Sequence, residues 1–547
     1  MTLAEEVRKF FKGDISDDEA TLKTYSHDAS LFEVKPKLVV FPKDTEDLKN
    51  LVKWVGENPG NSVTVRAAGS DMTGGPLGES VVADVTRYLN KMAEISEHKG
   101  LTSVLVEPGM FYRDFEQRTQ EKGLILPCFT ASKNLCALGG MFGNNCAGER
   151  SLRYGKMENF ILESKVIFAD GNEYVVKPLS RTELDVKMAQ GDFEGSIYQK
   201  IFSLVEDNKE ALAQAKPKVS KNSAGYYLWN VWDVEHQVFD INKLLVGSQG
   251  TLGIVTEMKL KLVPEKKYHD MVALFLKSWD ELPQVVNAIL PHDPESLETF
   301  DEDTLKLGIR FMPEIARKAG TGLVSFAAQF IPEILIGLRM LGLPKLIILV
   351  EIAEQAEGEV KEKVKKVMEA LKSFNVWSRV IEKDSEEEKF WVMRRESFNL
   401  LRKHVKGKRT APFVDDFCIS AEKVPEFLPR ALKILEEAGI EANIAGHAGN
   451  GNFHIIPLMD LRKESERKKI PIVADKFYDL VAEYKGTTTA EHNDGIVRTP
   501  YLNKMYSPKV LGLFKQTKEI FDPQNIFNPG KKVNGTLEYL ESHIAIE

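Results

Sequence analysis

Cysteine is scarce in this sequence, and its few copies are scattered. The 547 residues contain four cysteines, Cys128, Cys136, Cys146 and Cys418, and no two of them stand at C-x-x-C spacing. This number excludes a disulfide-built secreted scaffold and a self-contained iron–sulfur cluster of the ferredoxin type. We therefore expect reduced thiols and a cytoplasmic protein.

Long apolar runs and an excess of basic residues are missing as well. No uninterrupted apolar stretch reaches the roughly eighteen residues of a membrane span, and Glu5 and Glu6 stand where a secretory signal would be basic. Lys and Arg number 73 against 81 Asp and Glu, which gives a formal charge of -8. No overall basic field exists to attract nucleic acid, so we expect a soluble protein without a nucleic-acid partner.

The rest of the composition is that of an ordinary globular chain, with 43% hydrophobic and 28% charged residues and length for about two to four domains. In the first half, apolar residues recur at three- and four-residue spacing at 45–57 and 111–122, which predicts helices. The turn Ala169-Asp170-Gly171 predicts a β-hairpin, since Asp-Gly readily adopts the positive φ angles of a tight turn. Short β-like runs lie at 38–41, 62–65, 80–85, 102–106, 164–168 and 244–246.

A second unit follows Pro264, which ends the strand-like run 256–263. Its pattern predicts helices at 355–374 and 385–405 and a strand at 346–351. The stretch 506–532 is helix-like until Pro523, and Pro529-Gly530 gives a further stop signal. The sequence therefore predicts an α+β protein.

Three glycine clusters stand out in the first unit: RAAGSDMTGG at 66–75, GGMFGNNCAG at 139–148 and GSQGTLG at 247–253. The first follows a predicted strand, and a loop of small residues there can direct several backbone N–H groups toward one anion such as a pyrophosphate. Neither the Walker pattern nor G-x-G-x-x-G occurs, so the usual ATP loop and the Rossmann fingerprint are not supported. The alternative is that each cluster is a turn that only needs positive φ angles.

Taken in order, these motifs resemble the vanillyl-alcohol-oxidase family of PCMH-type FAD-binding proteins. The matching stretches are RAAGSDMTGG, Pro108-Gly109, LPCFTASKNLCALGGMFGNNCAGERSLRYG at 126–155, Ala169-Asp170-Gly171, VGSQGTLGIVT at 246–256 and FDPQNIFNPGK at 521–531, and 317–345 has no counterpart. The resemblance implies a PCMH-type FAD-binding domain of two α+β subdomains at 1–263 and an α+β cap domain for the substrate at 264–490. A C-terminal segment at 491–547 is expected to return to the flavin domain.

The resemblance also implies how FAD is held. Relatives with covalently bound flavin often carry a histidine in the first loop, whereas this chain has Ser70 after Gly69, so non-covalent FAD is expected. The residues implied to bind it are Arg66, Ala68, Gly69, Ser70, Asp71, Thr73, Gly74, Gly75, Pro127, Ser132, Gly139, Gly140, Asn144, Ala147, Gly148, Gly250, Gly253, Ile254 and Asn528.

A histidine pair in the second unit suggests a metal site on grounds independent of any family. Asn450-Gly451 is a strong hairpin signal, and a turn centred there places His447 directly opposite His454 on the paired strand. Directly opposed residues have Cβ atoms about 4.5–5.5 Å apart, close enough for two imidazoles to bind one divalent metal. Glu491-His492 could add a carboxylate ligand and a base. The alternative is that these histidines are hydrogen-bonded in a loop-rich core.

This cluster narrows the resemblance to the D-lactate, glycolate and D-2-hydroxyglutarate dehydrogenase branch. The branch pattern GH-x-G-D-GN-x-H and a later EHG imply that His447, His454 and Glu491 bind a divalent metal such as zinc or manganese and that His492 is the general base. Arg394 matches a carboxylate-binding arginine, although Arg394 and its neighbour Arg395 could equally lie on a solvated helix face. The chain departs from the branch in three places: Asn450 replaces Asp, EHND replaces EHG, and Phe413-Val414-Asp415-Asp416 replaces a stretch with a lysine before Tyr-Asp.

The implied function is that of an FAD-dependent dehydrogenase of a small 2-hydroxy acid, of the D-lactate or glycolate type. A metal would orient the hydroxyl group, His492 would take its proton, the α-hydrogen would pass as hydride to the flavin, and an arginine would hold the carboxylate. Electrons would then pass to a quinone, a cytochrome or another flavoprotein. One alternative is a carbon–oxygen bond-forming flavoenzyme of the alkylglycerone-phosphate synthase type, whose run of adjacent histidines is missing here. The other is a flavin-binding protein without turnover.

An apolar stretch at 322–344 has no counterpart in the resemblance. Ser325, Gln329 and Glu333 fall four residues apart on one helical face, so the stretch could be a helix packed on the core, which we favour. It could instead lie peripherally on the inner face of the membrane. Pro332 breaks any single helix through the stretch. The sequence leaves open whether the protein forms a homodimer.

Overall fold

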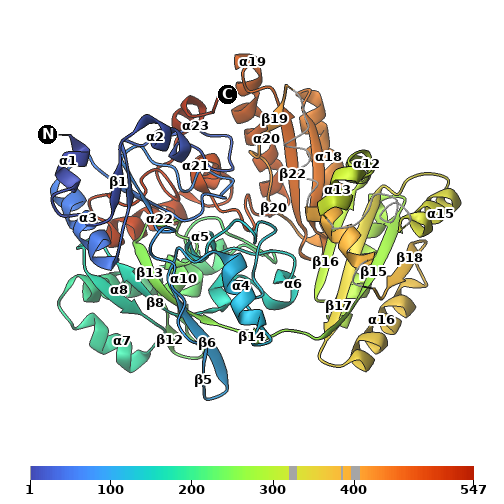
Figure 1. The fold of residues 1–547 in the computed structure, drawn as a ribbon, viewed down its shortest axis with the longest axis horizontal. Helices are drawn as coiled ribbons and strands as arrows, with labels where there is room; N and C mark the ends of the chain where they lie inside the picture. Colours follow the sequence, from blue (N-terminus) through green and yellow to red (C-terminus); the bar gives the residue numbers. More distant parts are fainter. Residues whose placement is uncertain (1, 319–328, 384–385, 396–406, 547) are drawn as a thin grey trace.

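Three larger sheets and two small ones organise the chain in a computed structural model, which describes residues 2–318, 329–383, 386–395 and 407–546 (Figure 1). The first sheet has the order β1-β2-β4-β3, with β2 and β3 both parallel to β4. The second is antiparallel, in the order β5-β6-β13-β8-β9. The third follows the order β18-β15-β17-β16-β21-β22-β19, with β20 also paired to β22.

The strands of the first two sheets are β1 (Asp14–Ser16), β2 (Leu38–Phe41), β3 (Val63–Arg66), β4 (Val81–Asp84), β5 (Ser96–His98), β6 (Leu101–Val106), β8 (Ile161–Ile167), β9 (Glu173–Val176) and β13 (Ile254–Lys261). Those of the third are β15 (Tyr268–Leu276), β16 (Ser296–Asp301), β17 (Leu346–Glu354), β18 (Trp377–Ile381), β19 (Arg409–Thr410), β20 (Phe417–Cys418), β21 (Glu441–His447) and β22 (Asn452–Met459). The small sheets use β7 (Leu124–Ile125), β10 (Leu179–Ser180), β11 (Trp232–Asp233), β12 (Val238–Phe239) and β14 (Val263–Pro264).

Helices cover these sheets. They are α1 (Leu3–Val7), α2 (Glu19–Tyr25), α3 (Thr45–Glu57), α4 (Tyr112–Gln120), α5 (Leu138–Asn144), α6 (Ser151–Tyr154), α7 (Arg181–Met188), α8 (Phe193–Asp207), α9 (Lys209–Ala215), α10 (Asn242–Leu245), α11 (Leu282–Ile289), α12 (Glu302–Arg310), α13 (Met312–Lys318), α15 (Ile331–Met340), α16 (Glu357–Leu371), α18 (Val424–Glu437), α19 (Glu464–Arg467), α20 (Lys469–Glu483), α21 (Gly495–Arg498), α22 (Pro508–Phe521) and α23 (Leu537–Ser542). None of the helices among the described residues is long and apolar enough to cross a membrane.

The third sheet is buried on both faces. Alternate residues of β15 point in opposite directions, so Val272 and Leu274 join the core cluster under α11, α16 and α18 while Ala273 and Phe275 join a second cluster with Trp391. The central strand β17 is buried along its whole length, which explains the apolar run 346–350 at its start.

The C-terminal segment leaves the third sheet and lies against the first unit (Figure 1). Helix α22 contacts α8 and α9, Phe527 bridges Val63 of β3, and Ile544 bridges Phe32. The Asp522 carboxylate accepts hydrogen bonds from the N–H groups of Ile526 and Phe527, which turns the chain sharply after α22. The FDPQNIFNPGK ending is therefore a turn that fixes the segment beside the first glycine cluster.

Most elements expected from the sequence pattern are confirmed. The helix expected at 45–57 is α3, the 346–351 run lies within β17, and β8 and β9 form the hairpin around Asp170-Gly171. The strand expected at 244–246 is wrong, because this stretch ends the short buried helix α10 and Val246 N–H returns to Asn242 O. A three-residue apolar run does not distinguish a buried strand from a buried helix. The expected 385–405 helix is seen at 386–395, and its remainder lies outside the described residues.

The apolar stretch at 322–344 packs on the protein with one face and exposes an apolar stripe on another. Only 329–344 of it lies within the described residues, where it forms α15. The polar residue Glu333 faces the protein and pairs with Arg379 and Lys389. An outward stripe at i, i+3, i+4 and i+7 is apolar, with Ile331, Ile334, Leu335 and Leu338 exposed by 54%, 58%, 51% and 67%. The helix nevertheless packs on a core cluster through Phe330, Met340 and the partly buried Ile336, as expected, while the apolar stripe faces away from the protein.

Candidate active site

A cavity of about 930 Å³ opens between the glycine-rich loops of the first unit and the β21–β22 hairpin of the second. This volume is at the upper end of the range of ligand pockets, roughly 300–1,000 Å³. The expected residues that line it are Arg66, Ala68, Gly69, Ser70, Asp71, Gly75, Ser132, Gly139, Gly140, Asn144, Ala147, Gly250, Gly253, Ile254, Arg394, His447, His454, Glu491 and His492. Five expected residues, Thr73, Gly74, Pro127, Gly148 and Asn528, are not among the residues lining it.

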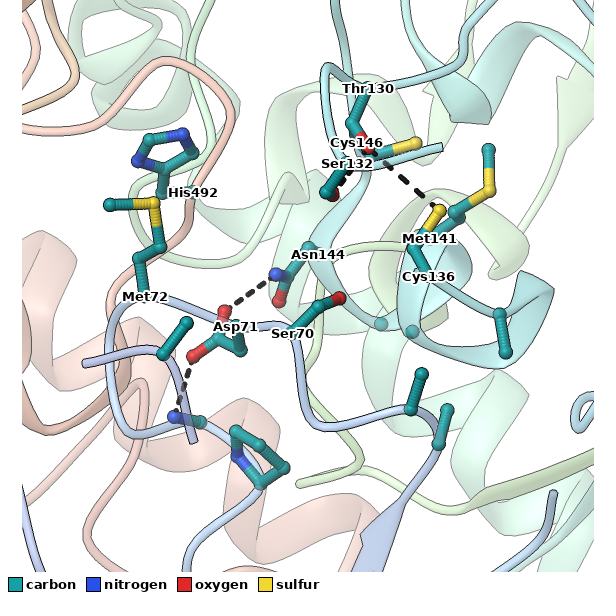
Figure 2. A pocket seen from close by; sticks show the side chains of 18 of the residues that line it. Ser70, Asp71, Met72, Thr130, Ser132, Cys136, Met141, Asn144, Cys146 and His492 are labelled. Carbon is teal, nitrogen blue, oxygen red and sulfur yellow. Dashed lines mark hydrogen bonds between the residues drawn. The ribbon is translucent and has the colours of Figure 1, made fainter. Parts of the chain in front are cut away.

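Asp71 shapes the first glycine loop from within. Its Oδ2 accepts hydrogen bonds from the N–H groups of Thr73 and Gly75, and its Oδ1 accepts one from Asn144 Nδ2 at 2.7 Å (Figure 2). Among the described residues, the N–H groups of Ala68, Gly69 and Ser70 have no acceptor in the chain. These are the backbone donors that remain available to an anion such as a pyrophosphate.

Glycine is required in these loops for close packing as well as for ligand access. A Cβ on Gly69, whose φ is +67°, would lie 2.2 Å from the Arg66 guanidinium. A Cβ on Gly148 would lie 1.9 Å from Phe129 O, so this residue permits two backbone segments to meet behind the cavity. Asn528 acts from behind as well, because its Nδ2 donates to Gly75 O and Gln249 O and so joins the first and third clusters.

The cavity has a sulfur-rich side and a side that carries the histidines. Figure 2 shows Cys136, Met141 and Cys146 on one side of the labelled loop residues and His492, beside Met72, on the other. Cys136 and Cys146 are buried, and burial raises the pKa of both thiols, that of Cys136 to about 12. Thiols in such surroundings are unreactive.

The two histidines of the hairpin share a face but do not stand directly opposite each other. Strands β21 and β22 pair so that His447 faces Asn452 and His454 faces Ala445, with the connection running over 448–451. The expected turn centred on Asn450-Gly451 is therefore wrong by one position. His454 is two residues beyond the partner of His447, so the two rings are diagonal neighbours on one face, with centroids 5.4 Å apart.

Glu491 brings the two imidazoles together. His447 Nε2 lies 3.0 Å and His454 Nε2 3.1 Å from the same oxygen, Glu491 Oε1. Three atoms bound to one tetrahedral ion with bonds of about 2.1 Å lie about 3.4 Å apart, so small movements would admit a metal. The donor set of two imidazoles and a carboxylate has the chemistry of a divalent-ion site, but among the described residues the group whose ligand atoms all lie within 4.8 Å of one another is Asp416, His454, Glu491 and His492, without His447.

Burial and charge set the protonation of this cluster. Burial alone would raise the pKa of Glu491, but Lys221 Nζ at 3.4 Å and His447 lower it well below its usual value. Burial lowers the pKa of His454, which favours the neutral ring that a metal binds. Burial also acts to lower the pKa of His447, yet the Glu298 carboxylate, 2.6 Å from Nδ1, raises it.

His492 lies in the same cluster, and its ring is oriented by Asp415. Its Nδ1 lies 2.8 Å from Asp415 Oδ2, and its ring stacks on His454 with centroids 4.9 Å apart. Burial lowers the pKa of His492, but the carboxylates of Asp416 and Asp415 outweigh this effect and raise it to about 9. A cation bound at Glu491 would oppose the rise by repelling the imidazolium charge.

Asp416 acts on the backbone of this loop. Its Oδ2 accepts hydrogen bonds from Thr489 Oγ1 and from the N–H groups of Ala490, Glu491 and His492. One ligand atom from each of Asp416, His454, Glu491 and His492 lies within 4.8 Å of the others, which makes Asp416 a candidate ligand as well. We assign it the supporting role, because its Oδ2 is already used by four donors.

Arg394, expected to bind the substrate carboxylate, and its neighbour Arg395 both line the cavity and pair with buried carboxylates. Arg394 Nη2 lies 3.3 Å from Glu298 Oε2, and Arg395 pairs with Glu149. Their side chains are 10% and 29% exposed, so the alternative of a solvated helix face is wrong.

Several residues of the site carry no local sequence signal. Glu298 lies on β16 and Lys221 in a loop, and each reaches the hairpin only through the fold. Asp415 and Asp416 were visible only as a departure from the expected motif. Their partner Arg498 ends the short helix α21 and could not have been singled out.

Two α+β units enclose a dinucleotide-sized cavity, with exposed loop amides at one end and a histidine–carboxylate cluster at the other. This arrangement is that of a flavin-binding protein. Comparison with known families agrees. The family described as FAD binding domain matches residues 36–177, and that described as FAD linked oxidases, C-terminal domain, matches residues 265–532. The chain belongs to the FAD-linked oxidases with a PCMH-type FAD-binding domain, and FAD is its cofactor.

The chain is similar in sequence to several named relatives. A D-2-hydroxyglutarate dehydrogenase of Pseudomonas putida is 27% identical over 95% of this chain but only 50% of its own length, so the chain spans about half of that relative. The glycolate oxidase subunit GlcD of Bacillus subtilis is 24% identical, over 95% of this chain and 93% of its own. A D-lactate dehydrogenase of Archaeoglobus fulgidus is 25% identical over 91% of both chains.

The similar solved structures support the fold alone. A 4-ethylphenol oxidase from Gulosibacter chungangensis has a TM-score of 0.69 at 16% identity and covers 98% of this chain and 97% of its own. An alkyldihydroxyacetonephosphate synthase has a TM-score of 0.64 at 15% identity, over 96% of this chain and 85% of its own.

Proposed function

We propose that the protein is an FAD-dependent dehydrogenase that oxidises a small 2-hydroxy acid, of the D-lactate or glycolate type, to the 2-oxo acid. The observation that carries the proposal is that His492 and the His447–His454–Glu491 cluster line the same cavity as the glycine-rich loops. A base, a metal-binding donor set and a flavin pocket are the parts that this oxidation needs. The dehydrogenase names of the relatives support the same class.

The proposed roles follow from the contacts. FAD, when bound, supplies the acceptor for the α-hydrogen and its two electrons. His447, His454 and Glu491 hold a divalent ion such as zinc or manganese, which supplies a Lewis acid for the substrate oxygens. His492 takes the hydroxyl proton, and Arg394 holds the substrate carboxylate beside Glu298.

The first glycine loop holds the FAD pyrophosphate in this proposal. The N–H groups of Ala68, Gly69 and Ser70 are available, while Asp71 and Asp28 bind the amides of Thr73, Gly74 and Gly75. For the other residues expected to bind FAD, contact with the cofactor stays a prediction. Thr73, Gly74, Gly148 and Asn528 shape the loops and are not among the residues that line the cavity. Ser70 lines the cavity where covalent relatives carry histidine, so the flavin is held without a covalent bond.

Anaerobic mixing of the purified protein with D- and L-2-hydroxy acids, with and without a chelator, tests the proposal. Bleaching of the flavin absorbance by one enantiomer, lost with the chelator, is the expected result. His492→Ala should abolish bleaching and keep the bound FAD. His236→Ala, at a side chain that is 70% exposed, is the matched control and should behave as the wild type. A yellow protein that none of the acids reduces would favour a flavin-binding protein without turnover.

We also propose that α15 contacts a membrane surface and that the reduced flavin passes its electrons to a quinone in that membrane. The outward stripe of Ile331, Ile334, Leu335 and Leu338 is apolar and carries Arg339 at its end, as in helices that lie in the plane of a membrane. The protein should sediment with anionic vesicles, and Ile334→Asp with Leu338→Asp should remove this binding without affecting flavin reduction. Sedimentation equilibrium that shows a dimer disrupted by the same changes would assign the stripe to a second copy of the chain.

A further inference from the structure

A buried arginine–aspartate pair lies behind His492, and neither residue is among those that line the cavity. Asp415 and Arg498 are both completely buried. Arg498 Nη2 donates to the backbone oxygen of Asp415 at 2.7 Å and pairs with Asp415 Oδ1, and its Nη1 donates to Asn493 O at 3.1 Å. Burying two charges is costly, and the pair is not a strong source of stability.

The second oxygen of Asp415 is directed at His492. With Oδ1 held by Arg498, Oδ2 lies 2.8 Å from His492 Nδ1. In a neutral imidazole one ring nitrogen carries the proton and the other accepts one, and a carboxylate acceptor fixes the proton on the nitrogen that faces it. The proton therefore stays on Nδ1, and Nε2 is the atom left to accept a proton.

Asp415 and Asp416 divide the control of His492 between ring and backbone. Asp416 Oδ2 accepts the N–H of His492 at 2.7 Å together with those of Ala490 and Glu491. Asp415 accepts none of these amides and contacts the ring. Stacking of His492 on His454, at 4.9 Å and an interplanar angle of 18°, leaves the ring little freedom to turn.

We propose that Asp415, held in place by Arg498, is a positioning residue that fixes the ring and the tautomer of His492 so that Nε2 faces the substrate. The inference rests on the proposed function, in which the hydroxyl proton of the substrate passes to His492 Nε2. At the same time the α-hydrogen leaves with its electron pair for FAD and the carbon–oxygen double bond forms.

Asp415→Asn is the informative substitution, because an amide has the shape of the carboxylate but can turn its NH2 group toward Nδ1. An amide NH2 group facing Nδ1 favours the tautomer that carries its proton on Nε2. In that tautomer Nε2 cannot accept a proton from the substrate. Loss of the equivalent aspartate in a serine protease lowers turnover by about 10⁴-fold for this reason. We expect the limiting rate of anaerobic flavin reduction to fall about 10³-fold. Substrate dissociation constant and FAD content should stay near the wild-type values, as a merely structural residue would not allow, while the thermal midpoint falls because the Arg498 charge stays buried without its counter-charge.

The wild-type enzyme provides a second measurement that does not depend on activity. Long-range ¹H–¹⁵N spectra of the ¹⁵N-histidine-labelled enzyme, recorded at the pH where the ¹⁵N shifts of His492 are those of a neutral ring, should show its proton on Nδ1. The resonance is identified by its loss in His492→Gln. Asp185→Asn, at an exposed carboxylate of α7, is the matched control for the kinetic measurement and should leave the rate unchanged.

The outcomes separate this inference from the proposed function. If no hydroxy acid reduces the wild-type flavin, the proposed function fails. If the wild type is reduced but Asp415→Asn reacts within threefold of it, or if the wild-type proton lies on Nε2, the positioning role of Asp415 is overturned. If Asp415→Asn does not fold, the wild-type spectrum still decides the question.

Discussion

Removing the charge of Asp416 should loosen the loop that carries Glu491 and His492. Oδ2 accepts hydrogen bonds from Thr489 Oγ1 at 2.7 Å, Glu491 N at 3.0 Å and His492 N at 2.7 Å. It also accepts one from Ala490 N, which has a second acceptor in Asp416 O. Asp416→Ala would thus leave three buried donors without a partner, at about 1–3 kcal/mol each, or about 5 kcal/mol together.

Asp416→Asn is the milder test, because the amide oxygen can replace Oδ2 and only the charge is lost. Burial raises the pKa of Asp416, but the charges of His492, His454 and Arg498 overcome this effect and hold it at about 2. A pKa of about 2 against the usual 3.8 corresponds to about 2 kcal/mol in favour of the ionised carboxylate. This stabilisation is present above pH 3.8 and is lost as the pH falls through 2, so it is complete at pH 7.

Hydrogen–deuterium exchange measures the effect where it arises. A loss of about 2 kcal/mol in local stability should speed exchange of the 489–492 amides about 30-fold at pH 7. Asp185→Asn, at the exposed carboxylate of α7, is the matched control and should leave their exchange unchanged. Exchange in Asp416→Asn within threefold of the wild type would refute the assignment of Asp416 as the support of this loop.

Three further results are expected. Burial and the neighbouring Asp71 raise the pKa of Asp28 from 3.8 to about 7, so its contribution to stability is present below pH 3.8 and is lost as the pH rises through 7. The FAD-free protein should lose about 1.4 kcal/mol from this group between about pH 6 and 8, and Asp28→Asn should remove that slope in denaturant titrations, or the shift is wrong. Gly148→Ala, whose Cβ would lie 1.9 Å from Phe129 O, should cost about 3 kcal/mol and release FAD. Gly512→Ala, with open space around it inside α22, should instead leave the thermal midpoint unchanged or raise it slightly. All four cysteines are buried, so the native protein should not react with a thiol reagent at pH 8 and the unfolded protein should show four thiols; reaction in the native state would contradict their burial.

Local patterns were sufficient to predict much of the fold and to name candidate site residues, most of which line the cavity. The apolar spacing in α3 and the Asp-Gly turn between β8 and β9 predict the helix and the hairpin to within a few residues, because helix period and turn chemistry are local properties. The histidines of the hairpin and Glu491-His492 were identified as candidates for the same reason. The run at 244–246 shows the limit, since three apolar residues fit either a strand or a helix and only their packing in α10 selects one.

The surroundings of those residues depend on contacts between distant parts of the chain. A shift of one position in the turn changes His447 and His454 from opposed to diagonal partners, and no pattern in the hairpin reveals it. Glu298 approaches His447 across 149 positions and Lys221 approaches Glu491 across 270, so their effect on the pKa values of the cluster exists only in the folded chain. The periodicity of α15 likewise does not predict that its apolar stripe faces outward. The spacing shows that the helix has two faces, but not which of them packs against the protein. Residue types and short-range spacing thus fix which groups are available for chemistry, while protonation, orientation and exposure follow from three-dimensional packing, because electrostatic and burial effects act through space rather than along the sequence.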